Sequence, residues 1–257
     1  MELRYQYIAF QTIVIKEFLR FIRIWPQTIV PPAVTTGLYF IIFGNLIGSR
    51  IGEMDGQPYM DFIVPGLILM AVINNAYSNV VSSFFSSKFN RHIEEMIVSP
   101  TPAYVIVTGF MAGGVARGLA VGAVVTGVSL FFTDLRVHNP LVMVSVVLLT
   151  SMLFALGGLI NGIFARTFDD ISIVPTFVLT PLTYLGGVFY SISLLPEFWQ
   201  KVSLANPILY MINAFRYGLL GVSDIPVGAA LAIVGGFVAG LYLLSVRLLM
   251  RGVGIRN

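Results

Sequence analysis

The chain has 257 residues, of which 57% are hydrophobic and 11% are charged, and its formal net charge at pH 7 is +3. A soluble domain carries roughly a quarter charged residues, so these values exclude a water-soluble globular protein, and disordered chains are more polar still. The absence of cysteine excludes a disulfide framework, a thiolate metal site and a cysteine nucleophile. The small basic excess is spread among apolar runs and does not indicate nucleic-acid binding.

The first 25 residues predict an amphipathic helix rather than a membrane span. Lys16, Arg20 and Arg23 fall on one stripe with Thr12, at spacings of four, four and three residues. A helix of this kind lies in the membrane interface with its basic side toward lipid headgroups or a partner protein. A basic flank that merely precedes the first span is the alternative interpretation.

Long runs without charge then predict six membrane crossings. A hydrocarbon core of about 30 Å requires roughly 20 apolar residues in a helix, whose backbone groups are all paired within the segment. The crossings are expected at residues 27–48, 60–84, 106–132, 140–164, 172–190 and 226–248. The whole chain is expected to form one transmembrane domain, in which residues 27–190 hold the first five spans.

The distribution of lysine and arginine predicts that both termini lie in the cytoplasm, because basic residues are enriched on that side. With this orientation the inner segments hold ten basic residues: Arg4, Lys16, Arg20, Arg23, Lys88, Arg91, Arg166, Arg247, Arg251 and Arg256. The outer segments hold four: Arg50, Arg136, Lys201 and Arg216.

The first inner loop, residues 85–103, is the most polar inner stretch after the N-terminus. Its charges suit a short helix that ends at the Ser-Pro-Thr-Pro run of residues 99–102, since a residue that precedes proline disfavours helix. This loop is the best docking surface for another protein, and its central residues are Arg91, His92, Ile93, Glu94, Glu95 and Met96.

The stretch from residue 186 to residue 216 is too polar to span a membrane and too apolar to be a free loop. A pair of short re-entrant helices on the outer side would fit it, because irregular backbone is tolerated at membrane depth where protein or water surrounds it. An ordinary loop followed by a tilted helix is the alternative. Its notable residues are Gly186, Gly187, Tyr190, Pro196 and Trp199.

Arg117 is the one charge that lies away from the ends of a predicted span, since Asp61 and Arg247 fall at span ends. The sixteen residues from Gly118 to Thr133 would cover about 24 Å of helix, which puts Arg117 near the inner edge of the hydrocarbon. It could extend to the headgroups, form an ion pair in an inner vestibule, or contact substrate. Asp169 or Asp170 in the second inner loop could be its partner.

Several kinds of chemistry have no signature here. No Gly-x-x-x-x-Gly-Lys-Ser/Thr phosphate loop occurs, and we find no metal-ligand spacing and no catalytic constellation. The expected spans also lack the buried ionisable residues of ion-coupled carriers. Energy for transport would then have to come from a separate protein.

The order of these parts resembles the ABC-2 type permeases. The run from Arg91 to Pro100 is similar to the family's glutamate-containing loop that ends in Ser-Pro. The stretch from Pro181 to Tyr190, followed by the Leu-Pro and Asn-Pro pairs and Arg216, is similar to the family's C-terminal signature. Phe168 to Ile171 and the overall length are similar to the YadH-like inner-membrane permeases of that family.

The resemblance implies an all-α integral membrane fold of the type V exporter kind, with six spans, an interfacial helix and re-entrant helices. It implies a homodimer that sits on two copies of a cytoplasmic ABC ATPase, which binds the ATP and Mg²⁺. This chain would bind no cofactor of its own. It would reside in the bacterial inner membrane, with the loop of residues 91–96 as the ATPase-coupling helix and residues 190–206 as the outer gate. A passive channel or gradient-driven carrier, and an intramembrane lipid enzyme, remain as alternative functions.

Overall fold

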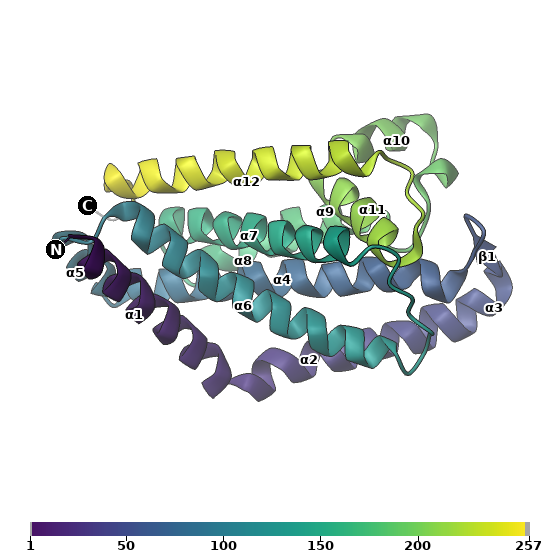
Figure 1. Ribbon diagram of the computed structural model, residues 1–257, viewed down its shortest axis with the longest axis horizontal. Helices are drawn as coiled ribbons and strands as arrows, with labels where there is room; N and C mark the ends of the chain where they lie inside the picture. The colour runs from purple at the N-terminus through teal and green to yellow at the C-terminus, as the bar shows by residue number, and fades with distance from the viewer. Residues whose placement is uncertain (1, 255–257) are drawn as a thin grey trace.

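The computed structural model describes residues 2–254, so Arg256 of the expected inner set lies outside the described residues. The described chain is almost entirely helical (Figure 1). The first half comprises α1 (Glu2–Arg23), α2 (Trp25–Tyr39), the π-helix η1 (Phe40–Ile47), α3 (Gly48–Ile51), the hairpin strands β1 (Glu53–Met54) and β2 (Gln57–Pro58), α4 (Tyr59–Phe89) and α5 (His92–Val98). The second half comprises α6 (Ala103–Ser129), α7 (Pro140–Phe164), α8 (Asp170–Val174), the π-helix η2 (Pro175–Leu179), α9 (Thr180–Tyr184), the short 3-10 helix η3 (Ile192–Leu194), α10 (Glu197–Leu204), α11 (Pro207–Leu220) and α12 (Val227–Met250).

Five helical segments are long and apolar enough to cross a membrane: Trp25–Ile51, Tyr59–Phe89, Ala103–Ser129, Pro140–Phe164 and Val227–Met250. They coincide with five of the six expected crossings, and this confirms a helical membrane fold. The first of them begins at Trp25 and keeps Pro31 and Pro32 inside α2. A single turn residue, Ile24, separates α1 from α2.

The segment expected as the fifth crossing, residues 172–190, is shorter in the structure. The helical stretch from Asp170 to Tyr184 has 15 residues, which is about 22 Å at 1.5 Å per residue and less than the hydrocarbon core. The chain leaves the helix where Gly187 adopts a positive φ of 77°, a conformation that glycine tolerates and most residues do not.

Helix α4 is the centre of the bundle, and 72% of its span is buried by other parts of the chain. Helix α7 packs tightly against it at Gly158, where a Cβ atom would lie only 2.5 Å from the backbone oxygen of Tyr77. Small residues let two helix backbones approach this closely. In a membrane, the van der Waals packing of such contacts stabilises helix association, because the hydrophobic effect does not act between helices in lipid.

The bundle has two distinct ends (Figure 1). Helix α5, the start of α1 and the end of α12 lie together at one end, which we call the terminal end. The β1–β2 hairpin, α3 and α10 lie at the other end, which we call the hairpin end. Helix α1 runs obliquely to the long axis of the bundle before α2 turns along it.

Candidate coupling and transport elements

Helix α5 is the short charged helix expected in the first inner loop. It follows Arg91, which adopts a left-handed conformation with φ of 62°. It ends at Ser99, whose hydroxyl donates to the carbonyl oxygen of Met96 at 2.6 Å. Glu94 and Glu95 lie in its first turn, where the helix dipole favours negative charge.

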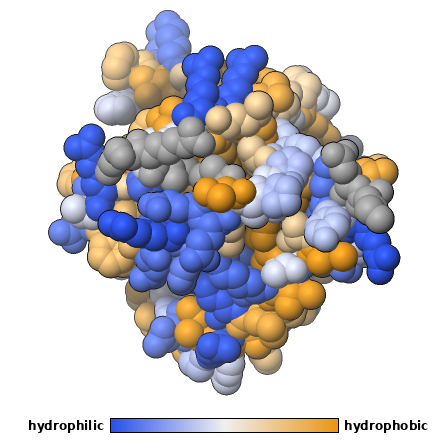
Figure 2. All heavy atoms as spheres, turned by 90° about the vertical axis from the view of Figure 1, so that its left-hand side faces the viewer, coloured by the Kyte–Doolittle hydropathy of each residue, from blue (hydrophilic) through white to orange (hydrophobic). Residues whose placement is uncertain are grey.

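One face of α5 is anchored in the bundle and the other is free. Ile93 is fully buried, in a cluster that contains Phe84 and Phe110, and Met96 packs against the same cluster. Glu94 and Glu95 are exposed. The helix therefore holds two carboxylates at the terminal end on a rigid base, and hydrophilic side chains gather across the centre of that face of the molecule (Figure 2).

A line of polar side chains on α4 was not anticipated from the sequence. Asn75, Asn79, Ser83 and Ser87 recur every four residues and are all buried. Since residues four apart share one face of a helix, they form a continuous strip, which we call the polar seam. Each member contacts a charged side chain of α1 or α6.

Three of these contacts come from α1. The Ser83 hydroxyl donates to Glu17 at 2.6 Å, Arg20 donates to the Asn79 side-chain oxygen at 2.7 Å, and Lys16 approaches the Ser87 hydroxyl at 3.4 Å. Lys16 and Arg20, two of the three cations of the basic stripe, thus contact polar side chains of α4. Arg23, the third cation of that stripe, is exposed.

Glu17 is the residue that sequence reasoning missed. Its side chain is fully buried, and its carboxylate lies 3.4 Å from the guanidinium of Arg20. Within residues 2–254 this is the only cation–carboxylate pair closer than 4.0 Å. A signal was available, because Glu17 occupies the buried stripe of α1 at four-residue spacing between Ile13 and Phe21.

Arg117 on α6 contacts Asn75, the first residue of the polar seam along the chain. Its guanidinium donates to the side-chain oxygen of Asn75, at 3.1 Å from Nη2 and 3.3 Å from Nε. The expected ion pair with Asp169 or Asp170 is wrong, because neither carboxylate lies within 4.0 Å of Arg117 in the described structure.

Asp170 is instead occupied within its own loop. Its carboxylate accepts hydrogen bonds from the backbone N–H groups of Arg166 at 2.8 Å and Thr167 at 3.0 Å. Short aspartate side chains satisfy nearby backbone donors in this way. These bonds, with a smaller contribution from the Thr167 hydroxyl, hold the pKa of Asp170 below its ordinary value.

At the hairpin end, Arg216 of α11 joins three segments. It is 2% exposed, it donates to the backbone oxygen of Gly187 at 2.8 Å, and its guanidinium carbon lies 3.8 Å from the ring centre of Phe62 on α4. Through these two contacts, the buried guanidinium of Arg216 connects the irregular backbone after α9 to the central helix α4.

The other residues expected at the outer gate lie around that backbone. Gly186 is buried and packs against Ile208 of α11. The hydroxyl of Tyr190 donates to the carbonyl oxygen of Tyr184 at 3.0 Å, and Pro196 precedes α10, on which Trp199 is exposed. The structure therefore forms two short helices here, α10 and α11, and α11 is almost wholly buried.

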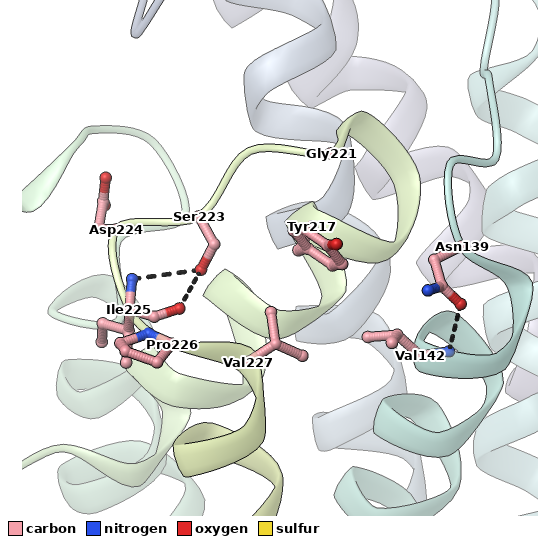
Figure 3. Close-up of a pocket in the computed structure, with 9 residues that line it drawn as sticks. All are labelled: Asn139, Val142, Tyr217, Gly221, Ser223, Asp224, Ile225, Pro226 and Val227. Carbon is pink, nitrogen blue, oxygen red and sulfur yellow. Dashed lines mark hydrogen bonds between the residues drawn. The ribbon is translucent and has the colours of Figure 1, made fainter.

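An open hollow of about 670 Å³ lies at the same end, where α7 begins, α11 ends and α12 begins (Figure 3). It is lined by Asn139, Val142, Tyr217, Gly221, Ser223, Asp224, Ile225, Pro226 and Val227. Desolvation raises the pKa of Asp224, although the nearby Arg216 opposes this. Among the residues that the structure describes, no group of three or more histidine, cysteine, aspartate and glutamate side chains could hold a metal ion.

Membrane-length helices around a buried central helix, with few charged residues in their interior, define a polytopic helical membrane protein. The model of the ABC-2 type transporter family matches residues 8–220. The chain belongs to this family, which confirms the resemblance read from its motifs. It is 58% identical over 251 residues to the inner membrane transport permease YadH of Escherichia coli K12, with 98% of each chain covered. It is 26% identical over 217 residues to nodulation protein J of Sinorhizobium fredii, with 84% of this chain and 82% of that protein covered.

Proposed function

We propose that this chain is the permease subunit of an ATP-binding cassette exporter. It is not itself an enzyme, and it couples ATP hydrolysis by a separate ATPase to outward movement of an amphiphilic, lipid-linked, glycan or drug-like substrate. The observation that carries the proposal is α5, where buried Ile93 anchors a helix that presents Glu94 and Glu95 at the terminal end. A chain with no phosphate loop and an exposed charged docking helix is suited to receive force from another protein.

The proposed assembly has two copies of this chain on two copies of a cytoplasmic ABC ATPase. ATP and Mg²⁺ bind to the ATPase, and membrane lipid surrounds the permease. Membership of the ABC-2 family supports an ATPase partner, and the name of the Escherichia coli relative supports transport at the inner membrane.

In this arrangement the terminal end faces the cytoplasm, so both termini are cytoplasmic. Lys88, Arg91 and Arg166 at that end support this orientation, because cytoplasmic loops are enriched in basic residues. The helical stretch Asp170–Tyr184 provides a sixth crossing together with the irregular backbone after it. Residues 190–206, which include α10, form the outer gate, and the re-entrant helix α11 that follows is tied to Gly187 by the hydrogen bond from Arg216.

An ATP-independent channel or gradient-driven carrier is the second candidate, and one observation favours it. A carrier of this kind keeps an ionisable pair in its interior, and Glu17 and Arg20 are such a pair. The pair lies on α1, however, and Arg20 remains 29% exposed, so it is better placed to hold α1 against the bundle than to carry ions across it.

The docking assignment is tested by co-purification of an ABC ATPase with the full chain. Reversing both charges with Glu94→Arg and Glu95→Arg is expected to abolish co-purification and ATP-dependent transport in vesicles. The matched control is Glu53→Arg with Asp134→Arg, which reverses two exposed charges at the hairpin end outside the proposed gate and is expected to leave both intact. Loss in both double variants, or in neither, would remove α5 as the docking element. Uphill transport by the purified chain without any ATPase would establish the carrier instead.

A further inference from the structure

A small polar hollow opens at the terminal end between α1, the last turns of α4 and the start of α5. Its volume is about 170 Å³. It is lined by Lys16, Arg20, Ser86, Ser87, Asn90 and His92, together with Ser83, whose hydroxyl already donates to Glu17. This space is large enough for one compact polar group.

The charge around the hollow is positive. Arg20 is balanced by Glu17, at 3.4 Å. Lys16 has no carboxylate within 4.0 Å among the described residues, and Arg117, farther along the polar seam, is paired only with the neutral side chain of Asn75. Lys16 is exposed and can reach an anion in the hollow, and Arg20, at 29% exposure, adds to the attraction because charges interact more strongly where solvent is partly excluded.

The hollow also has donors to spare. The Nε atom of Arg20 is buried without a hydrogen-bond partner, and Lys16 makes only the long 3.4 Å contact with Ser87. The hydroxyl of Ser86 lies on the same wall. Guanidinium, ammonium and hydroxyl donors around a compact space are the groups that bind phosphate oxygens in proteins.

We propose that this hollow is a binding site for a phosphate group, either the headgroup phosphate of an anionic amphiphile or a free phosphate anion. This proposal rests on the proposed function, because it places the site at the cytoplasmic headgroup level of a permease. The amphiphile that the permease transports, or that regulates it, would then carry a phosphate group. Lys16 supplies the uncompensated charge, Arg20 a directed donor, and Ser86 and Ser87 the hydroxyls.

The test measures ligand binding to the purified full chain in a neutral detergent, by native mass spectrometry and by thermal shift. The probes are phosphatidic acid, diacylglycerol with the same acyl chains, and inorganic pyrophosphate. We expect phosphatidic acid to bind more tightly than diacylglycerol, and Lys16→Gln to weaken phosphatidic acid about tenfold, as loss of one charge-assisted bond predicts. Lys16→Arg should restore most of the binding.

The matched control is Arg4→Gln, which removes an exposed cation from the same helix outside the hollow. It is expected to leave binding unchanged. Equal binding of phosphatidic acid and diacylglycerol, or equal weakening by Lys16→Gln and Arg4→Gln, would overturn the site. If pyrophosphate binds with the same dependence on Lys16, the site takes the free anion; if only phosphatidic acid does so, it takes a lipid headgroup.

Failure of this site and failure of the proposed function give different results. ATPase co-purification depends on α5 and is expected to survive Lys16→Gln. A chain that recruits the ATPase but shows no Lys16-dependent phosphate binding would overturn only the site. A chain that binds phosphate through Lys16 but never recruits an ATPase would overturn only the exporter.

Discussion

Glu17 of α1 lies in a notch that Gly113 leaves on the surface of α6. A Cβ atom at position 113 would come within 2.5 Å of the Cβ atom of Glu17, with the Glu17 Cγ atom 3.0 Å away. The helix that carries the N-terminal charges is therefore inserted against the bundle, and a buried carboxylate is held at the point of closest approach. This contact joins the segment beside the proposed coupling helix to the interior of the membrane domain.

The notch predicts that Gly113→Ala destabilises the protein even though alanine favours helix. Overpacking a tight contact costs about 1–3 kcal/mol, whereas replacing glycine by alanine in a helix gains about 1 kcal/mol. We expect a net loss of stability of about 1 kcal/mol, the middle of the resulting range of about 0–2 kcal/mol, measured by thermal unfolding of the detergent-solubilised chain. Gly127→Ala on the same helix, where nothing lies within 4 Å of the added atom, should be neutral or stabilising. Equal behaviour of the two variants would show that α1 does not pack here.

The buried pair predicts an asymmetric response to single substitutions. Glu17→Ala should cost about 3 kcal/mol, at the lower end of the range for breaking a buried pair, because Arg20 keeps its bonds to Asn79 and part of its exposure. Arg20→Ala should cost more, since it leaves the fully buried Glu17 carboxylate without its cation.

The double variant Glu17→Ala with Arg20→Ala should then be more stable than the sum of the single effects predicts. A coupling free energy of about 1–3 kcal/mol is expected for residues in direct contact, and chemical denaturation of all four proteins measures it. Additive effects would mean that the two charges do not interact in the folded protein.

Arg216 predicts strict side-chain requirements at the hairpin end. Arg216→Leu should cost about 2–4 kcal/mol, because it leaves the Gly187 carbonyl oxygen without its donor and removes the cation from the Phe62 ring. Arg216→Lys should recover only part of this, since lysine lacks the planar group that stacks and donates at once. The reference is Arg136→Gln, an exposed cation near the same end, which is expected to change stability by about 0.5 kcal/mol or less. A fully active, fully stable Arg216→Lys protein would contradict this role.

Asp170 predicts a contribution to stability that disappears in acid. Its pKa in the folded protein is lowered by the Arg166 and Thr167 backbone bonds. Its stabilisation is therefore complete above the unfolded-state pKa of about 3.9 and is lost as the pH falls through the lower folded-state value. Asp170→Asn should flatten the dependence of melting temperature on pH below about pH 4, whereas Asp169→Asn should not. A steeper acid slope in Asp170→Asn would reverse the assigned direction.

The amino-acid sequence by itself determined five of the six expected membrane crossings and where the charged inner helix ends. Apolar runs of 20 or more residues must form helices in lipid, and the Ser-Pro-Thr-Pro run after α5 cannot continue one, so both features depend on local chemistry. The family signature could be recognised for the same reason, because its glycines and prolines determine the local conformation of the backbone.

Only the tertiary structure decided which charged residues meet. Glu17 belongs to α1 and Ser83 to α4, 66 positions apart, and nothing in either segment indicates that they touch. The expected pairing of Arg117 with an aspartate failed because an asparagine on α4 was nearer. The direction of Lys16 and Arg20 was likewise set by the way α1 packs into the glycine notch of α6, a contact between distant segments that no local pattern specifies.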